Sequence, residues 1–408
     1  MCDNMGDTHM TLVLFFGGEL DAGRVKRAFR LSLDAEPVLG CRFVERPVRP
    51  RWLRLEDLDR RLPFSTVEIG DTRRGAVEFA ERPMDPKAGP AAEALLMRSG
   101  SDTLCVKVHH AAADAGGVKE YGSLLCSIYR RLAGDSTWVP SPNIAGDRTL
   151  RQVYRRIGLR ARARSLRDGV SPRQTWGFPF PDLEARDRAF SVRRLGEKAP
   201  VALAERRARS GATVNDLLLT AYFRALCGIG HVEAGTRLPV DVPVDLRRYL
   251  PEGKAGAVCN LSGQLYPVLE HMDGEPFEGT LARVREVMGR FKENSPGIGS
   301  ATCIESYLRS GFGISRRVFD RMVESMAGDG RATPFLSNFG VLSEGDFDVG
   351  GVPLDDAFII SPLMFPPSLL TGVTTFRDSM TMTVGYTGEG SNGPVIEEFL
   401  DLFERELT

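Results

Sequence analysis

The chain has 408 residues, of which 42% are hydrophobic and 26% charged, and its formal net charge is −1. This composition is typical of a globular protein, and the length suits two ordinary domains or one large pseudo-symmetric unit. A net charge near zero provides no overall attraction to nucleic acid or to an anionic membrane, so any electrostatic binding site must be local.

The cysteines and the N-terminus indicate a cellular location. The seven cysteines are odd in number and none are spaced as C-x-x-C, which favours reduced thiols over a disulfide framework. The apolar run at 12–16 is too short for the core of a signal peptide, and no stretch reaches the about 20 apolar residues of a membrane span. We therefore expect a soluble, cytoplasmic protein without a transmembrane segment.

Strands and helices alternate in the first part of the chain. A strand is predicted at 12–16, and Asp21 is placed to cap a helix that ends near Leu33. Val25 and Phe29 mark the inner face of that helix. Further strand-like stretches are 40–45, 64–69 and 103–109.

A second helix is predicted directly after the glycine pair at 116 and 117. Apolar residues recur there at intervals of three and four, namely Val118, Tyr121, Leu125, Ile128 and Leu132. His109 and His110 therefore lie on a turn between a buried strand and a helix.

Residues 146–190 differ from the rest, and we expect them to connect an N-terminal lobe (1–145) to a C-terminal lobe (191–408). Arginines are spread throughout 148–167, with a narrow apolar stripe of a basic helix at Leu150, Val153, Ile157 and Ala161. Three interpretations remain open for this helix: a solvated surface, a site for the phosphates of coenzyme A, or a docking surface for an acidic carrier protein or an anionic membrane.

The second half of the chain again mixes the two kinds of element. The expected helices are 201–226, 275–293 and 394–407, and the expected strands are 236–245, 261–268, 357–361 and 379–386. Alternation in both halves predicts an α/β or α+β protein with mixed sheets.

The two histidines are the first candidates for chemistry. Adjacent side chains on a strand point to opposite faces, so one of His109 and His110 is the functional candidate and the other is structural. An imidazole, with a pKa near ~6.5, is suited to accept a proton at neutral pH. The alternative is that both histidines are interior residues whose hydrogen bonds are satisfied and that neither has a catalytic role. A metal site is disfavoured because the five histidines form no H-E-x-x-H or zinc-finger spacing.

The whole string HHAAADAGG (109–117) resembles the HHxxxDG signature of the chloramphenicol acetyltransferase-like superfamily. This superfamily includes condensation domains of peptide synthetases, alcohol acetyltransferases and wax ester synthases. Four more stretches are similar to conserved stretches of the superfamily and follow its order: EPVLGCRF (36–43), GATVNDLLLTAYFRAL (211–226), VPVDLRRYL (242–250) and FLSNFGVL (335–342).

The resemblance implies a fold and a catalytic base. Two chloramphenicol acetyltransferase-like lobes would form a pseudo-dimer in one chain, with an active-site tunnel between them. His110 would be the general base in that tunnel, and His109 would be structural. Asp114 would point away and pair with Arg247, bracing the loop that holds the base; Arg248 is the adjacent competitor for this pairing.

The chain departs from the signature at one position. Ala115 stands where the superfamily has glycine, and Gly116 follows it. A positive φ directly after Asp114 would strain an alanine. A turn shifted by one residue, with Gly116 in the supporting role, would avoid this strain.

Other residues near the expected tunnel have weaker signals. Asn338 and Ser337 are candidates to stabilise the oxyanion of a tetrahedral intermediate. Thr213 is better explained as a helix cap. Asn260 and Ser262 match a tunnel-facing strand of the superfamily only loosely.

The function that the resemblance implies is transfer of an acyl group from a thioester to a hydroxyl acceptor. Acyl-CoA or a phosphopantetheinyl carrier would be the co-substrate, with no permanently bound cofactor and no nucleic-acid partner. The alternatives are a free-standing condensation enzyme that forms an amide from a carrier-bound donor, and a catalytically silent homologue that binds a carrier protein or lipid. Peripheral membrane contact is compatible with each of them.

Overall fold

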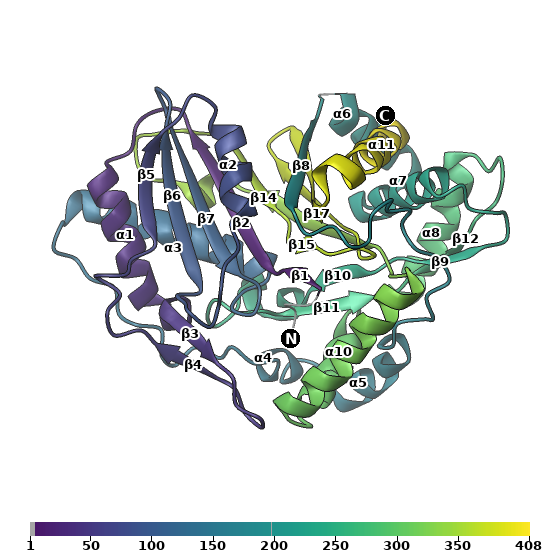
Figure 1. The fold of residues 1–408 in the computed structure, drawn as a ribbon, viewed down its shortest axis with the longest axis horizontal. Helices are drawn as coiled ribbons and strands as arrows, with labels where there is room; N and C mark the ends of the chain where they lie inside the picture. The colour runs from purple at the N-terminus through teal and green to yellow at the C-terminus, as the bar shows by residue number, and fades with distance from the viewer. Residues whose placement is uncertain (1–4, 197) are drawn as a thin grey trace.

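The computed structural model describes residues 5–196 and 198–408. Two lobes of strands and helices lie side by side, one on the left of Figure 1 and the other on the right. Each lobe is built on its own mixed sheet, which contains parallel and antiparallel neighbours. The predicted fold class, a two-lobed α/β protein with mixed sheets, is confirmed.

The sheet of the first lobe has the strand order β14, β2, β7, β6, β5. Its neighbours are antiparallel except for β5 and β6, which are parallel. The strands are β2 (His9–Phe16), β5 (Phe64–Glu68), β6 (Ala92–Arg98), β7 (Asp102–His109) and β14 (Leu354–Ile360). Helices α1 (Ala22–Ala35) and α3 (Ala115–Gly134) cover one face, and α2 (Thr72–Glu81) covers the other.

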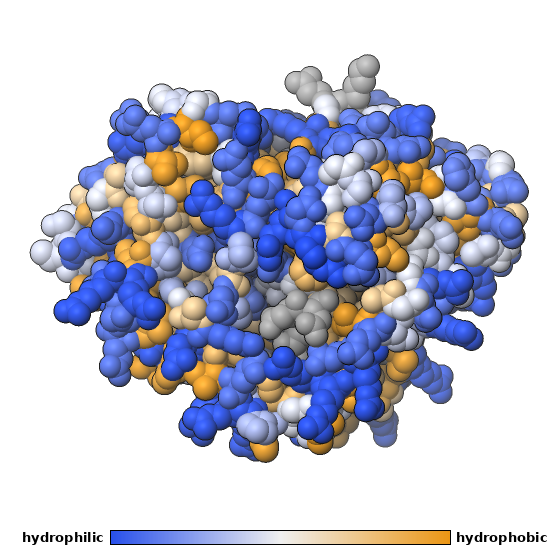
Figure 2. Space-filling view, viewed as in Figure 1, coloured by the Kyte–Doolittle hydropathy of each residue, from blue (hydrophilic) through white to orange (hydrophobic). Residues whose placement is uncertain are grey.

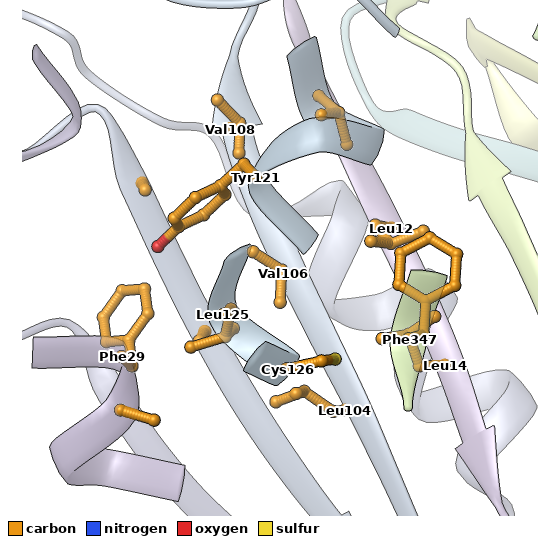
Figure 3. Packing of buried hydrophobic residues seen from close by; sticks show 14 of the residues in the cluster. Leu12, Leu14, Phe29, Leu104, Val106, Val108, Tyr121, Leu125, Cys126 and Phe347 are labelled. Carbon is orange, nitrogen blue, oxygen red and sulfur yellow. The ribbon is translucent and has the colours of Figure 1, made fainter. Parts of the chain in front are cut away.

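The strand β7 separates the two layers of this lobe. Because successive side chains of a strand point to opposite faces, Val106 and Val108 face α3, where Figure 3 shows them beside Tyr121. Lys107 points to the other side and contacts the end of α2. His109, the last residue of the strand, follows the same alternation and is turned away from α3.

The predicted helices of this lobe are confirmed. Asp21 accepts a hydrogen bond from the Arg24 amide at 2.9 Å and so caps α1, which buries Val25 and Phe29. The residues whose spacing predicted α3 are all buried: Val118, Tyr121, Leu125, Ile128 and Leu132. The strands expected at 40–45, 64–69 and 103–109 correspond to β3 (Cys41–Val44), β5 and β7, and β3 forms a hairpin with β4 (Arg51–Arg54).

The sheet of the second lobe has the order β1, β15, β17, β16, β13, and β8 also pairs with β17. The strands are β1 (Gly6–Asp7), β8 (Arg188–Leu195), β13 (Phe335–Leu342), β15 (Leu363–Met364), β16 (Leu370–Phe376) and β17 (Ser379–Thr387). The helices are α6 (Lys198–Ser210), α7 (Val214–Ile229), α8 (Phe277–Lys292) and α11 (Glu389–Leu407). Tyr222 meets Phe399 and Phe403 edge-on in the core between α7 and α11.

Several expected elements of this half are divided in two. The helix expected at 201–226 is broken into α6 and α7 at Gly211, whose φ of 66° ends the first helix. The strands expected at 236–245 and 261–268 each become two short ones, which pair with each other. The ladders are β9 (Arg237–Pro239) with β12 (Val268–Glu270), and β10 (Val242–Asp245) with β11 (Ser262–Leu265).

The two sheets do not follow the expected ranges 1–145 and 191–408. β14, from the C-terminal half, pairs with β2 and forms an edge of the first sheet. β1, from the N-terminus, pairs with β15 in the second sheet. Each half of the chain therefore contributes a strand to the other lobe.

The connecting segment also differs from expectation. The single basic helix is replaced by α4 (Arg151–Tyr154) and α5 (Leu159–Ser165), which are separated at Gly158. Val153 and Ile157 of the expected stripe are buried against Leu246. The remaining α-helices, α9 (Ile298–Leu308) and α10 (Phe312–Asp329), come after α8 in the chain, and α9 packs against α5.

Two further observations concern the thiols and the helices of the described residues. Every cysteine in the described part is a free thiol. Within residues 5–196 and 198–408, no helix combines the length and the apolar character that crossing a membrane requires.

Candidate active site

The two adjacent histidines have different surroundings. The amide of His110 donates to the carbonyl of Thr8 at 2.7 Å, which fixes the turn at the end of β7. His109 is buried, and its Nδ1 accepts a hydrogen bond from the Ala111 amide at 3.1 Å. The ring of His110 is only partly buried. Of the pair, His110 is therefore the one that a substrate can reach.

Asn260 holds the ring of His110. Its Nδ2 lies 3.1 Å from Nδ1 of His110 and 3.0 Å from the carbonyl oxygen of the same residue. An amide NH₂ can only donate, so this contact favours the neutral tautomer in which Nδ1 accepts and the proton is on Nε2. The Asn260 Oδ1 accepts from the Ser262 amide at 3.2 Å, which favours this orientation of the side chain in the unliganded protein.

Asp114 lies behind this contact and is buried. Its carboxylate accepts two hydrogen bonds from Nη1 of Arg247, at 2.8 and 3.0 Å. It also accepts from the amide of Gly117 at 2.8 Å, and so caps α3, and from the amide of Leu261 at 2.7 Å. The carboxylate is therefore engaged in holding backbone amides and Arg247, and among the hydrogen bonds of the described residues none joins it to His110.

Arg247 completes the brace. Its Nη2 donates to the carbonyl of Cys259 at 2.8 Å, and its Nε donates to Glu120 at 3.1 Å. Burial, the largest single effect, would lower the pKa of Arg247, but Asp114, Glu120 and Asp245 together outweigh it and raise the pKa, so the guanidinium stays charged. Arg248, the alternative partner for Asp114, is exposed.

These contacts explain how the pair supports the histidine. Arg247 holds the carbonyl of Cys259 and Asp114 holds the amide of Leu261, which are the two residues on either side of Asn260. Asn260 in turn contacts His110. The buried ion pair thus fixes the backbone that presents Asn260, and through it the ring.

The start of α3 shows why alanine is tolerated at position 115, where the signature has glycine. Ala115 is the first residue of the helix after the Asp114 cap and does not have a positive φ. A side chain at Gly116 would place its Cβ 2.5 Å from Nη1 of Arg247. Gly116 is therefore required by the close approach of Arg247 rather than by its backbone angles.

Asn338 and Ser337 lie on β13 of the second lobe. The Asn338 Nδ2 donates to Oδ1 of Asn215 at 2.5 Å, and its Oδ1 accepts from the Gly340 amide at 2.8 Å. Among the hydrogen bonds of the described residues, none joins Asn338 or Ser337 to His110. Lys119 of α3 reaches the same strand and donates to the Phe339 carbonyl at 2.9 Å.

The helix start near Asn338 has the structural role expected for it. Thr213 accepts a hydrogen bond from the Asp216 amide at 3.2 Å, and Asp216 accepts one from the Thr213 amide at 3.0 Å. This reciprocal pair is a capping box. The prediction that Thr213 caps α7 is confirmed.

A buried polar cluster supports β7 from the side opposite α3. Nζ of Lys107 donates to the carbonyls of Phe79 and Arg82 at 2.6 and 2.7 Å, and Nε2 of His9 lies 2.8 Å from the carbonyl of Ala80. Burial lowers the pKa of Lys107 to about 8. Burial, followed by the charge of Lys107, lowers the pKa of His9 to about 3. Both side chains bind carbonyl groups at the C-terminal end of α2.

The sequence did not identify His9 and Lys107 as functional or structural candidates, and Asn260 matched a tunnel-facing strand only loosely. The first two stand in an apolar strand pattern, which conceals a polar residue bound to distant backbone. Asn260 and His110 are separated by 150 positions in the sequence, and only the folded chain brings them together.

Two cavities lie away from His110. One, of about 380 Å³, is lined by residues of α2, β8 and β14, among them Arg73, Arg194 and Phe358. The other, of about 80 Å³, is lined in part by Val323 and Phe365. His110 lines neither of them. In the described part of the chain, no three His, Cys, Asp or Glu side chains are grouped to hold a metal ion.

The sequence matches no protein-family model, and no curated protein matches it. Solved structures do match over nearly the whole chain. The first condensation domain of the CDA synthetase has a TM-score of 0.68 and 18% identity, with 99% of this chain and 92% of that one covered. Polyketide synthase associated protein 5 from Mycobacterium tuberculosis has a TM-score of 0.66 and 16% identity, covering 98% and 94%.

An acetyltransferase has the same architecture. Trichothecene 15-O-acetyltransferase from Fusarium sporotrichioides has a TM-score of 0.67 and 11% identity, with 99% of this chain and 92% of that one covered. At these identities the likeness concerns the fold. The resemblance found in the sequence is confirmed at this level: the chain has the two-lobed, chloramphenicol acetyltransferase-like fold of condensation domains and related acetyltransferases.

Proposed function

We propose that this chain is an acyltransferase that moves an acyl group from a thioester to a hydroxyl acceptor. The observation that carries the proposal is the braced contact between Asn260 and the partly exposed ring of His110. The burial of the Asp114 and Arg247 pair behind it supports a site in which one imidazole is held in a fixed orientation. Condensation domains and an O-acetyltransferase of the same fold support acyl transfer as the reaction class.

In the proposed reaction, His110 acts as general base. The acceptor hydroxyl oxygen attacks the thioester carbonyl carbon while the ring takes the hydroxyl proton. The tetrahedral intermediate then collapses, the carbon–sulfur bond breaks, and the proton passes to the leaving thiolate. The products are an ester and a thiol, and no bound cofactor takes part. Acyl-CoA or a phosphopantetheinyl carrier supplies the acyl group.

The site imposes two conditions on this mechanism. A base at Nε2 requires the proton on Nδ1, so the Asn260 amide has to turn its oxygen to the ring. Asn338 or Ser337 would stabilise the oxyanion, and Asn338 would first have to release Asn215. Asp114, Gly116 and Arg247 would be positioning residues, and His109 a structural one.

A second candidate function is binding of a carrier protein or lipid without catalysis. It is favoured by the hydrogen bond from Asn260 to Nδ1 of His110, which leaves the ring proton on Nε2, the nitrogen that the reaction would need unprotonated. Amide formation from a carrier-bound donor remains the alternative reaction, because an amine acceptor needs the same base.

The test is release of thiol from acyl-CoA donors, acetyl to palmitoyl, with mixed alcohols and amines as acceptors. His110→Ala is compared with His271→Ala, in which a partly exposed histidine paired with Asp273 is removed. We expect acceptor-dependent release that falls roughly 10²-fold or more in His110→Ala. The His271→Ala variant should keep the native rate.

The outcomes separate the candidates. Equal release by native and folded His110→Ala protein would exclude this residue as the base. Release with amines alone would replace ester formation by amide formation. No release from acyl-CoA or from an acylated carrier protein would leave binding without catalysis as the function.

A further inference from the structure

The helix α10 has three of its large apolar residues on the outside. Of its residues, all within the described part, only Ser315 is buried. Ile314, Val318 and Met322 are spaced by four positions, so they lie on one face, and each is exposed. The helix is nevertheless well anchored, because Phe312 packs edge-on against Phe43 of the first lobe at 5.7 Å. The exposed stripe therefore belongs to a docked helix.

The neighbouring elements α9 and α5, with the turn that follows α5, contribute further exposed apolar residues. α9 packs against α10 and also against α5 and the 3-10 turn that follows α5 (Leu166–Asp168). Seven of the sixteen large hydrophobic side chains that are exposed in the described chain lie in these segments, and an eighth, Val170, lies two residues after the turn; their exposures are 42% to 79%. They are Leu159, Leu166, Val170, Ile304, Leu308, Ile314, Val318 and Met322. Such a concentration indicates an interaction surface.

The same surface has an excess of positive charge. Among the ion pairs of the described residues, none involves the exposed arginines of these segments, Arg160, Arg164, Arg167, Arg317 and Arg321. Five acids lie in the same segments: Glu305 pairs with Arg309 and Asp320 with Arg316, and the others are Asp168, Glu324 and Asp329. The chain as a whole has a net charge of only −1. The excess of positive charge is therefore concentrated on α5 and the turn after it, which contain four arginines and one acid.

We propose that the face formed by α5, α9 and α10 binds an anionic lipid surface. In this arrangement the apolar side chains enter the boundary between headgroups and acyl chains, while the arginines reach the lipid phosphates. The face lies along the lower part of the molecule in Figure 1, where Figure 2 shows blue residues interspersed with orange ones. The proposal is independent of the transferase reaction.

The geometry favours a lipid surface over a partner helix. A docked helix fits its apolar side chains into a groove, whereas the exposed side chains here protrude from three separate segments. The nearby cavity is lined by Val323 and Met326 on the inner side of α10 and contains none of the eight exposed residues. Anionic headgroups complement the unpaired arginines without needing a matched shape.

The test is cosedimentation of the full chain with vesicles of phosphatidylcholine alone or mixed with phosphatidylglycerol. We expect binding to the mixed vesicles that weakens as salt is added. The variants Arg317→Ser/Arg321→Ser and Val318→Ser/Met322→Ser should each bind roughly tenfold or more weakly. Because these residues are exposed, the variants should keep the native circular dichroism and Tm.

A matched control comes from α6, at the opposite, upper edge of Figure 1. It also has exposed arginines and an exposed valine, so Arg207→Ser/Arg209→Ser and Val201→Ser should bind as the native chain does. The proposal is overturned by equal loss in α6 and α10 variants, by equal binding to both vesicle types, or by no binding. Binding of a purified acidic carrier protein or dimer formation through this face, with no vesicle binding, would equally overturn it.

Discussion

At the scale of single residues, the side-chain amide of Asn260 decides which nitrogen of His110 is free. Its NH₂ group faces Nδ1 and the backbone carbonyl of that histidine. We predict that the neutral ring of the native protein carries its proton on Nε2. In Asn260→Asp, a carboxylate beside the ring can only accept, so the proton should move to Nδ1.

Nitrogen-15 spectra of histidine-labelled protein test this prediction directly. The protein has five histidines, and His110→Gln identifies the signal of interest. If Nε2 is the catalytic base, Asn260→Asp should also transfer acyl groups at least tenfold faster than Asn260→Ala, in which nothing orients the ring. A proton found on Nδ1 in the unliganded native protein would contradict the predicted tautomer.

At the scale of a single element, the first turn of α3 has no room for a side chain at Gly116. In Gly116→Ala the new Cβ would lie 2.5 Å from Nη1 of Arg247, and the buried pair with Asp114 would have to shift. We expect a loss of about 2–4 kcal/mol in the free energy of unfolding, measured in urea, because a disturbed buried ion pair leaves charge uncompensated.

Gly134, the last residue of the same helix, provides the matched control. A side chain there meets nothing within 4 Å. Gly134→Ala should therefore be neutral or stabilise the protein by up to about 1 kcal/mol, since alanine is the better helix former. Equal effects at the two positions would show that helix propensity, and not the approach of Arg247, determines the cost.

The contact between β2 and the end of α2 is expected to depend on pH. Burial and the charge of Lys107 lower the pKa of His9 to about 3, and His109 and Arg188 also face it with the same sign of effect. Below pH ~6.5 the unfolded chain takes up a proton that the folded chain excludes, so stability falls with decreasing pH.

Between pH 7 and pH 5 we expect His9 to account for a loss of about 2 kcal/mol, at ~1.4 kcal/mol per pH unit below the ordinary value. His9→Gln keeps a donor for Ala80 but does not titrate, so its urea midpoint should fall less over this range. His271→Gln, at a partly exposed site, serves as the control. Parallel declines in native and His9→Gln protein would refute the assignment.

These elements also show which helices and strands can be predicted from the sequence. α1 and α3 were predictable because their apolar residues repeat within a few positions and a carboxylate caps each start. β6 and α2 were missed, as was α10, whose apolar stripe faces outward and gives no core signal. In the candidate site, Asp114 and Arg247 were found through a resemblance. The contact between Asn260 and His110 depends on the folded chain and has no local signal.

At the scale of the whole molecule, the sequence predicted two lobes but not their exchange of strands. β14 pairs with β2 although more than three hundred residues separate them, and no local pattern identifies such a partner. Phe358 of that strand then joins Phe190 of the second lobe and Phe79 of α2 in one buried cluster between the lobes. The lobes therefore share both a sheet edge and a core.

This sharing predicts that the two lobes unfold together. The three tryptophans report on both: Trp52 and Trp138 pack against the first core, and Trp176 packs against the second. In Trp176→Phe and in Trp52→Phe/Trp138→Phe, the urea transition followed by fluorescence should coincide with that followed by far-ultraviolet circular dichroism. Each variant is its own control, because both signals come from the same sample. Separate midpoints would mean that a lobe keeps its structure after losing the strand that the other half supplies, and that the exchanged strands contribute little to stability.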